Sequence, residues 1–379
     1  MVRLRRSLTV LLVSAVGLAA FQSTPAEAAP SSVNRAATWI ASQVSGGQLD
    51  DGFSPVGASA DGLIALASAD DPALKPTIDT LLATVRSGAA DYVAGGGGPA
   101  AGKLAVVAAA YDLDPRSFGG VDLVAALEAG VAEDGSVGPY PSAFGSGLAL
   151  VGFGRTGADA PAAVTTWLAG QQNDDGGFGY AAGQPSDADN TALAILGLLA
   201  DDSPAARPVL DEAVAWAVGA RKADGSWDGY VPVNSTCVLG SAVDAAGAGV
   251  ASTRTFVTSR QLAGGAITDG EGANLMATSQ CAPLLGDVSY LDVEWAPAKA
   301  SVTPSPTTVP PSQNPPAADD DTDASPSPTV TAAPTADDEA DGGRGVPART
   351  GADEDVPALP LALASVGLAV GVAALRRRA

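Results

Sequence analysis

The sequence predicts an all-α domain of six stacked helix–loop–helix repeats. Residues 167–199 show the pattern best, with an apolar segment, an Asp-Gly-Gly loop and a second segment whose leucines recur at helical spacing. The pattern recurs around loop glycines at positions 52, 98, 135, 176, 225 and 270, which lie 37 to 49 residues apart. Such a period indicates stacked units that bury their apolar faces against one another. Two helices per unit give about twelve helices.

Unit four, residues 167–199, is the template. Asp175 and Gly176 bring turn chemistry, because Asp bonds its own backbone and Gly reaches positive φ without penalty. Phe178 is expected to fold beneath this loop. Asp187 or Asp189 is expected to cap the second helix, whose buried face carries Leu193, Leu196 and Leu199.

The other units follow in chain order. Unit one repeats the template with Trp39, Gln43 and a longer loop that ends in Gly52 and Phe53. Unit five (211–246) is a specific match, because Trp227 falls where Phe178 does. The weaker copies are units two (78–113), three (121–153) and six (253–285), centred on Gly98, Gly135 and Gly270.

Composition excludes several classes of function. The 379 residues carry 20 Lys and Arg against 42 Asp and Glu, a formal net charge of −22. This balance argues against nucleic acid as a partner, since phosphates need basic side chains. Histidine is absent, which removes Ser-His-Asp and Cys-His catalysis and His-ligated zinc. Two cysteines cannot form a Cys-only metal site, and no cofactor is expected.

The two cysteines suggest a disulfide. Cys237 and Cys281 follow the loop glycines of units five and six by 12 and 11 residues, which predicts matching places on neighbouring second helices. In an exported protein such a pair is expected to be bonded. The alternative is two buried thiols that pack as small apolar groups.

Unit two contains a run of glycines that ends at Gly98. A phosphate-binding loop would need a following Gly-Lys-Ser/Thr and a preceding strand, and both are missing. Lys103, a few residues later, is a lone cation that either reaches into a cavity or extends to water.

Both ends of the chain indicate export. Residues 1–28 have a basic start, an apolar run and an Ala-Glu-Ala cleavage site, which together predict a secretory signal peptide. The repeat domain, 32–295, is followed by a Pro/Ser/Thr/Asp-rich stalk, 297–345, that is expected to be disordered because it has few apolar residues to bury. Residues 358–375 have the length and apolarity of a transmembrane helix and precede three arginines.

Just upstream of this helix, residues 347–351 read Pro-Ala-Arg-Thr-Gly. This resembles the Leu-Ala-x-Thr-Gly sorting signal used by sortases of high-GC Gram-positive bacteria, with Pro in place of Leu. The resemblance implies cleavage between Thr350 and Gly351 and transfer to peptidoglycan within a sorting segment, 347–379. The alternative is a plain membrane anchor. Either way, the protein is expected to be extracellular and held at the cell wall or plasma membrane.

The motif from Gln172 to Phe178, followed by Asp189-Asn190-Thr191-Ala192, resembles the prenyltransferase/squalene-oxidase repeat superfamily. That resemblance implies a six-repeat α/α toroid, with six inner and six outer helices around a cavity. Each helix after a loop would be an inner one, with its first residues at the rim.

Three branches of that superfamily are relevant. Protein prenyltransferases bind zinc through His, which this chain lacks. Terpenoid cyclases carry Asp-x-Asp-Asp-Thr-Ala, and residues 187–192 differ from it at Asn190. This resemblance implies Asp189 as a proton donor, whereas helix capping is the alternative role for Asp187 and Asp189. Only 5% of the chain is aromatic, although cyclases need aromatic walls to stabilise carbocations.

The third branch is the exported cobalamin carriers. Residues 276–286 and 290–293 are similar to the end of their helical domain. Those carriers close the binding site with a β-rich second domain, where this chain has its stalk, so a separate lid would be required.

These observations favour a non-catalytic toroid that binds a small molecule or surface partner at its cavity mouth. A terpenoid cyclase using Asp189, a cobalamin-type carrier and a purely structural wall protein are the alternatives. The candidate rim residues, each placed near the start of an expected inner helix, are Asp61, Lys103, Tyr140, Asp187, Asp189, Asn190, Asn234 and Asn274.

Overall fold

The computed structural model describes residues 31–297, which form eleven α-helices, one short 3-10 helix and isolated bridges but no strand. The predicted all-α class is confirmed for this range. Among these residues no helix is long and apolar enough to cross a membrane. The expected signal peptide (1–28), the stalk beyond residue 297, the sorting site at Thr350 and Gly351, and the membrane segment (358–375) lie outside the described residues.

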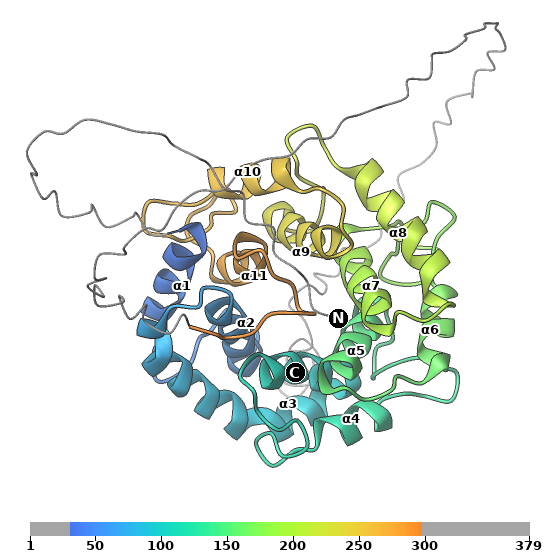
Figure 1. Cartoon of the computed structure of the whole chain (residues 1–379), viewed down its shortest axis with the longest axis horizontal. Coiled ribbons are helices and arrows are strands. Elements are labelled where there is room, and N and C mark those ends of the chain that lie inside the picture. The colour runs from blue at the N-terminus through green and yellow to red at the C-terminus, as the bar shows by residue number, and fades with distance from the viewer. Residues whose placement is uncertain (1–30, 298–379) are drawn as a thin grey trace, which may run out of the picture. The chain divides into compact units, whose positions relative to one another are not determined.

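The helices form two concentric rings (Figure 1). The inner ring contains α2 (Pro55–Ala67), the second half of α3 (Lys75–Ala110), α5 (Ala143–Thr156), α7 (Ala188–Asp201), α9 (Pro232–Ala245) and α11 (Leu275–Leu285). The outer ring contains α1 (Ser32–Ser42), the first half of α3, α4 (Leu123–Ala129), α6 (Ala162–Ala169), α8 (Ala206–Ala220) and α10 (Ala251–Ser259). A 3-10 helix, η1 (Pro72–Leu74), precedes α3. Since α11 packs against both α9 and α2, the inner ring is closed.

The six-repeat prediction is confirmed, although the two helices of unit two are joined. There the outer and inner helices run together as α3, interrupted only at Gly97, which has φ 62° and ψ −143°. This positive φ favours glycine. Pro99 follows in the first turn of the second half, where a missing backbone N–H costs nothing. The glycine run therefore marks a break between two helices.

A buried residue lies beneath the loops of four units, and its backbone N–H donates to a hydroxyl on the following inner helix. In unit four Phe178 donates to Thr191 Oγ1 at 2.9 Å, and in unit five Trp227 donates to Thr236 Oγ1 at 3.0 Å. The same bond joins Leu49 to Ser59 and Ile267 to Thr278. This recurring hydroxyl fixes the register of the inner helices.

That register corrects the alignment of units one and six. Leu49, not Phe53, is the buried residue of unit one, and Phe53 is 51% exposed. Gln261 in unit six donates to Gly265 O as Gln172 in unit four does to Gly176 O. The equivalent loop glycines are therefore Gly47 and Gly265, two residues before Leu49 and Ile267, and not Gly52 and Gly270.

The loop glutamines also link neighbouring units. Gln172 Nε2 donates to Val209 O on α8 at 2.8 Å, and Gln261 Nε2 donates to Ser32 O on α1 at 2.8 Å. The second bond joins the last unit to the first. The outer ring is thus closed by the same interaction that connects two consecutive units.

Glycines let the inner helices approach closely. A Cβ on Gly147 would lie 2.0 Å from Leu193 O, and one on Gly102 would lie 2.4 Å from Leu148 O. A Cβ added to Gly197 would likewise lie 2.6 Å from Gly147 Cα. The centre of the ring is narrow because these helices nearly touch.

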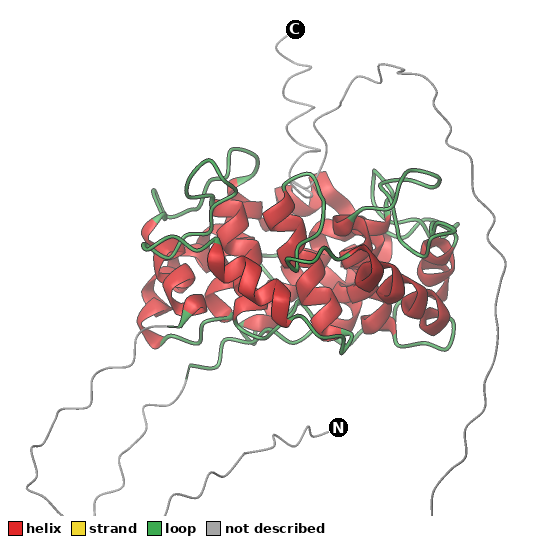
Figure 2. Ribbon diagram, turned by 90° about the horizontal axis from the view of Figure 1, so that it is seen from above, coloured by secondary structure: helices red, strands yellow, loops and turns green. Residues whose placement is uncertain are grey.

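Viewed from the side, the helices form one layer with loops along both faces (Figure 2). We call the face at which the inner helices begin the mouth face; its loops are residues 43–54, 130–142, 170–187, 221–231 and 260–274. The strap, residues 286–297, crosses the opposite face. Arg155 donates to Leu291 O at 2.7 Å and Val293 O at 2.6 Å, and Trp295 N donates to Ala110 O.

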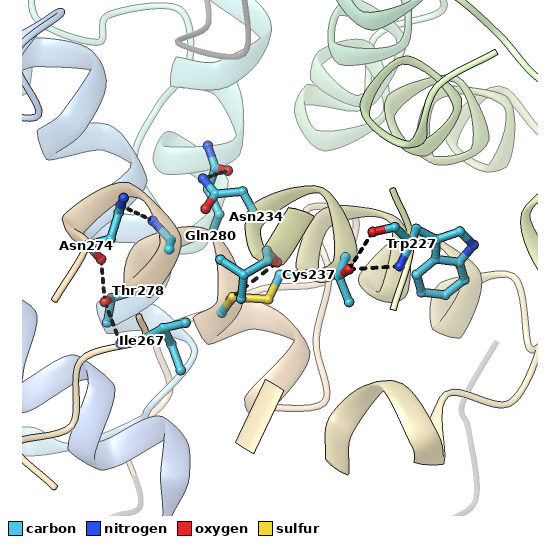
Figure 3. Close-up of a disulfide and its surroundings, with 11 residues drawn as sticks. Trp227, Asn234, Cys237, Ile267, Asn274, Thr278 and Gln280 are labelled. Atoms are coloured by element: carbon cyan, nitrogen blue, oxygen red, sulfur yellow. Dashed lines mark hydrogen bonds between the residues drawn. A yellow bond between two sulfur atoms is a disulfide. The ribbon is translucent and has the colours of Figure 1, made fainter. Parts of the chain in front are cut away.

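Cys237 and Cys281 form the predicted disulfide, which joins α9 to α11 (Figure 3). Their places on the two helices do not match, however. Cys237 comes one residue after the register hydroxyl of Thr236, and Cys281 comes three residues after that of Thr278. The expected match depended on Gly270, which is not the equivalent glycine.

Candidate functional site

The centre of the inner ring holds a small pocket. Its lining residues on α5 and α7 are four positions apart, so that they form two layers along the pocket axis. The upper layer, nearer the mouth face, includes Phe144 and Asp189, and the lower layer includes Leu148 and Leu193. The complete lining is Lys103, Phe144, Leu148, Asp189, Leu193, Val238, Gln280 and Tyr290.

Lys103 does not extend to water. Its Nζ lies 2.7 Å from Asp61 Oδ1, and the two side chains are only 4% and 8% exposed. Burial works against the lysine charge, but the Asp61 carboxylate outweighs that effect and holds the pKa of Lys103 above its usual range. Lys103 therefore lines the pocket as one member of a buried ion pair that joins α2 to α3.

Asp189 is the second ionisable group in the pocket. Burial raises its pKa to about 7, against the opposing effect of Ser235, whose hydroxyl donates to Asp189 Oδ2 at 2.7 Å. The neighbouring Asp187 adds a smaller upward shift. Asp189 thus retains its proton at much higher pH than an ordinary aspartate does.

Capping belongs to Asp187 alone. Its Oδ1 accepts hydrogen bonds from the backbone N–H groups of Asp189 and Asn190, at 3.0 and 2.8 Å, at the start of α7. Of the two expected caps, Asp189 is instead a lining residue.

The amide of Asn190 links two helices. Its Nδ2 donates to Asp187 Oδ2 at 2.9 Å, and its Oδ1 accepts from Phe144 N on α5 at 3.2 Å. An aspartate here would place a second carboxylate against Asp187. Asn190 therefore has a positioning role in this chain.

The remaining candidates lie at different distances from the pocket. Asn234 precedes Thr236 by two positions, as Asp189 precedes Thr191, so the two residues are equivalent in the repeat. Its Nδ2 donates to Gln280 Oε1 at 3.1 Å (Figure 3). Its own Oδ1 is buried without a hydrogen-bond partner. Asn274 caps α11 and donates to Asp269 at the surface. Tyr140 is 64% exposed on the mouth face, outside the pocket.

The structure thus brings Lys103, Asp61, Asp189 and Asn234 to the centre, but not Tyr140 or Asn274. Two polar lining residues, Gln280 and Tyr290, were not predicted from the sequence, and neither were the apolar ones, Phe144, Leu148, Leu193 and Val238. Gln280 comes two residues after Thr278, as Leu193 comes two residues after the equivalent Thr191. The register of unit six, once aligned on this hydroxyl, therefore indicates Gln280 as a lining residue. Tyr290 belongs to the strap, outside the repeats, and no repeat pattern indicates its position.

Tyr290 closes the pocket at the strap face, and burial raises the pKa of its hydroxyl. The space left for the centre of a water-sized sphere is about 10 Å³. That is enough for roughly one water molecule. No group of three or more metal-binding side chains occurs in the part of the chain that the structure describes.

No known family model matches the chain, and no curated protein is significantly similar in sequence. Solved structures match its fold. A protein from Actinoplanes is similar with TM-score 0.51 and 16% identity, over 68% of this chain and 98% of that one. The type II terpene cyclase MstE from Scytonema, in its apo form, is similar with TM-score 0.50 and 15% identity, over 67% and 96%.

Haptocorrin in complex with Cbi is also similar, with TM-score 0.50 and 13% identity over 71% of this chain and 70% of that chain. The cyclase and haptocorrin share their ring of helices with this chain. At these identities the likeness concerns the fold alone. The described domain therefore has the α/α toroid fold of these proteins.

Proposed function

We propose that this toroid is a non-catalytic binding domain that recognises its ligand or partner at the mouth of the central pocket. The observation that carries the proposal is the pocket itself. Its lining combines three polar side chains, Lys103, Asp189 and Gln280 on α3, α7 and α11, with leucine and valine side chains on α5, α7 and α9. A few convergent polar groups in an apolar setting are typical of recognition sites.

The size of the pocket supports binding at its mouth. Space for roughly one water molecule is far below the 300–1,000 Å³ typical of sites that enclose an organic ligand. A ligand would therefore contact the upper layer and the surrounding loops. Asn234 Oδ1 is buried without a partner beside Gln280, which lines the pocket.

A terpenoid-cyclase-like enzyme is the second candidate, because of one observation. The pKa of Asp189 is about 7, so the residue could donate a proton at neutral pH. The pocket contains only two aromatic side chains, Phe144 and Tyr290, to stabilise a carbocation. The small volume also leaves no room for a polyprenyl chain.

One experiment separates the candidates. The purified protein is incubated with geranylgeranyl and longer polyprenyl substrates, and in parallel is examined by native mass spectrometry for molecules that co-purify. A binding domain gives a saturable ligand and no cyclised product. Product formation that disappears in Asp189→Asn supports the cyclase instead, and the absence of both results supports a structural wall protein.

We also propose that the domain is exported and held at the cell surface. The disulfide between α9 and α11 is consistent with an oxidising compartment. Mass spectrometry of the mature protein from its host tests the sorting site. A C-terminus at Thr350 linked to peptidoglycan supports sortase processing, whereas a retained 358–375 segment supports a membrane anchor. A cobalamin-type carrier would in addition require a lid from another chain.

A further inference from the structure

Exposed aromatic rings gather on the mouth face. Each of the four lies in the segment that leads into an inner helix: Phe53 before α2, Tyr140 before α5, Tyr180 before α7 and Tyr230 before α9. Their exposed fractions are 51%, 64%, 43% and 65%. We call these four residues the aromatic rim.

The rest of the exposed large apolar residues in the described range follow the same distribution. Leu262 lies in another mouth-face loop, and Val218 lies in the last turn of α8, which leads into the loop 221–231. Within residues 31–297, none lies on the strap. All six exposed large apolar residues of the described range thus lie in the mouth-face loops or directly before one, so this face is the one with apolar surface to offer a partner. Tyrosine is also enriched in protein interfaces, because it combines an apolar body with a polar tip.

The loops of the mouth face carry fixed negative charges. Asp134, Asp175, Asp224 and Asp269 each accept a hydrogen bond from the backbone N–H two residues later. Hydrogen bonds lower the pKa of all four carboxyls. The strongest lowering effect comes from the serine hydroxyls of Ser136, Ser186 and Ser226 for Asp134, Asp175 and Asp224, and from the backbone N–H of Glu271 for Asp269. These groups stay ionised and hold one orientation.

The basic residues of the same loops already have partners within the domain. Lys222 forms an ion pair with Asp228. Arg221 donates to Gly249 O and lies over the Trp227 ring, 5.7 Å from its centroid. Arg260 lies over Phe256 at 4.9 Å. The mouth face therefore presents aromatic rings and oriented carboxylates, and Asp134, Asp175, Asp224 and Asp269 are hydrogen-bonded but form no ion pair within the described residues.

We infer that the mouth face docks a basic segment of another protein, with the aromatic rim stacking against Arg and Lys side chains while the loop carboxylates pair with their charges. This inference rests on the proposed function and names the class of partner. Cation–π contact and apolar packing of the long basic stems both use exposed rings. Complementary charge guides the approach.

A neutral glycan could also stack on the rings, but it offers no charge to match the oriented carboxylates. The test compares three probes by isothermal titration calorimetry with the purified protein: a synthetic Arg/Gly peptide of about twelve residues, a Glu/Gly peptide of the same length, and a chitooligosaccharide. We expect saturable binding of the Arg/Gly peptide only.

Variants separate docking from general attraction to an acidic protein. Tyr140→Ser combined with Tyr230→Ser keeps every charge and should weaken binding about tenfold or more. Asp134→Asn with Asp224→Asn should also weaken it. The matched control is Asp112→Asn with Asp159→Asn, which removes the same number of charges from exposed residues next to the opposite face and should leave the affinity within about twofold.

Equal affinities in all variants would overturn the inference. Rim-dependent binding of the chitooligosaccharide in place of the peptide would overturn the basic partner but leave the proposed binding function intact. If no probe binds and no molecule co-purifies, the binding function itself fails.

Discussion

Lys103 Nζ and Asp61 Oδ1 lie 2.7 Å apart at the centre of the toroid, on side chains that are each less than a tenth exposed. The pair joins α2 to α3 and occupies one side of the lumen. Taking two charges out of water is costly, and their mutual attraction compensates only while both partners are present. The packing at the centre of this domain is therefore stable only while Lys103 and Asp61 are both present.

Replacing only one member of this ion pair should lower the stability of the folded domain strongly. Lys103→Met leaves an unpaired buried carboxylate and should lower the free energy of unfolding by about 3–5 kcal/mol, whereas Lys103→Met with Asp61→Leu should recover most of the loss. Urea unfolding measures both. The control is Lys75→Met, which removes an ion pair whose side chains are 52% and 56% exposed and should cost less than about 1 kcal/mol. Similar losses for Lys103→Met and Lys75→Met would contradict this account.

Asp189 should make stability depend on pH. Its pKa is about 7 in the folded protein and about 4 in an unfolded chain. Between these values the folded state holds the proton that the unfolded state has lost, so stability falls as pH rises from about 4 to about 7 and is constant above that. The total loss is about 4 kcal/mol.

Asp189→Asn is neutral at every pH and serves as the reference. We expect the difference in unfolding free energy between the native protein and this variant to decline across that window, measured by urea unfolding at several pH values. Subtracting the variant removes the contribution of the other carboxyls. A difference that does not change with pH would show that Asp189 ionises normally.

The repeat architecture was predictable from the sequence because helices, tight loops and their period leave strong local signals. The Asp-Gly loops and the leucine spacing of unit four are examples. Unit six was misaligned because its buried residue is Ile267 and its loop contains no Asp before Gly265. The tight turn keeps its Gly and its Gln261 bond, but the aromatic signal is missing.

The site was less predictable, because it depends on contacts between helices. Asp61, Lys103 and Asp189 were predicted from the sequence, but the pairing of Lys103 with Asp61, 42 positions away, was not. Tyr290 enters the pocket from the strap, so its position is set by the bonds of Arg155 and Trp295. Tertiary contacts of this kind have no periodic signature.

The hydrogen bond to the hydroxyl beneath the loop should contribute measurably to the free energy of unfolding. Thr191→Val keeps the shape of the side chain but leaves the buried N–H of Phe178 without its acceptor, at a cost of about 1–3 kcal/mol. Thr191→Ser retains the hydroxyl and should lose clearly less. Thermal unfolding followed by circular dichroism compares the two, and equal losses would show that the methyl group matters more than the hydrogen bond.

Close packing of the inner ring predicts opposite effects for two Gly→Ala substitutions. In Gly147→Ala the new Cβ would lie 2.0 Å from Leu193 O, so α5 and α7 must separate, with a loss of about 1–3 kcal/mol. Gly219 lies in α8 with nothing within 4 Å of an added Cβ, and Gly219→Ala should stabilise by about 0.5–1 kcal/mol. Urea unfolding distinguishes the signs. A stable Gly147→Ala would mean that the inner helices tolerate wider spacing.

The disulfide should stabilise the last two units of the ring. Cys237 and Cys281 are 44 positions apart, and closing a loop of that length in the unfolded chain is worth about 4 kcal/mol in the chain-entropy account. Cys237→Ala with Cys281→Ala should therefore lower the unfolding free energy by a few kcal/mol. Because the two cysteines of the chain are bonded to each other, alkylation of the unreduced protein should label no thiol. The native protein treated with a reductant during unfolding is the matched control and should lose a similar amount. Stability that is unchanged by both treatments would show that the ring is held closed by α11 packing and the bond from Gln261 to Ser32 alone.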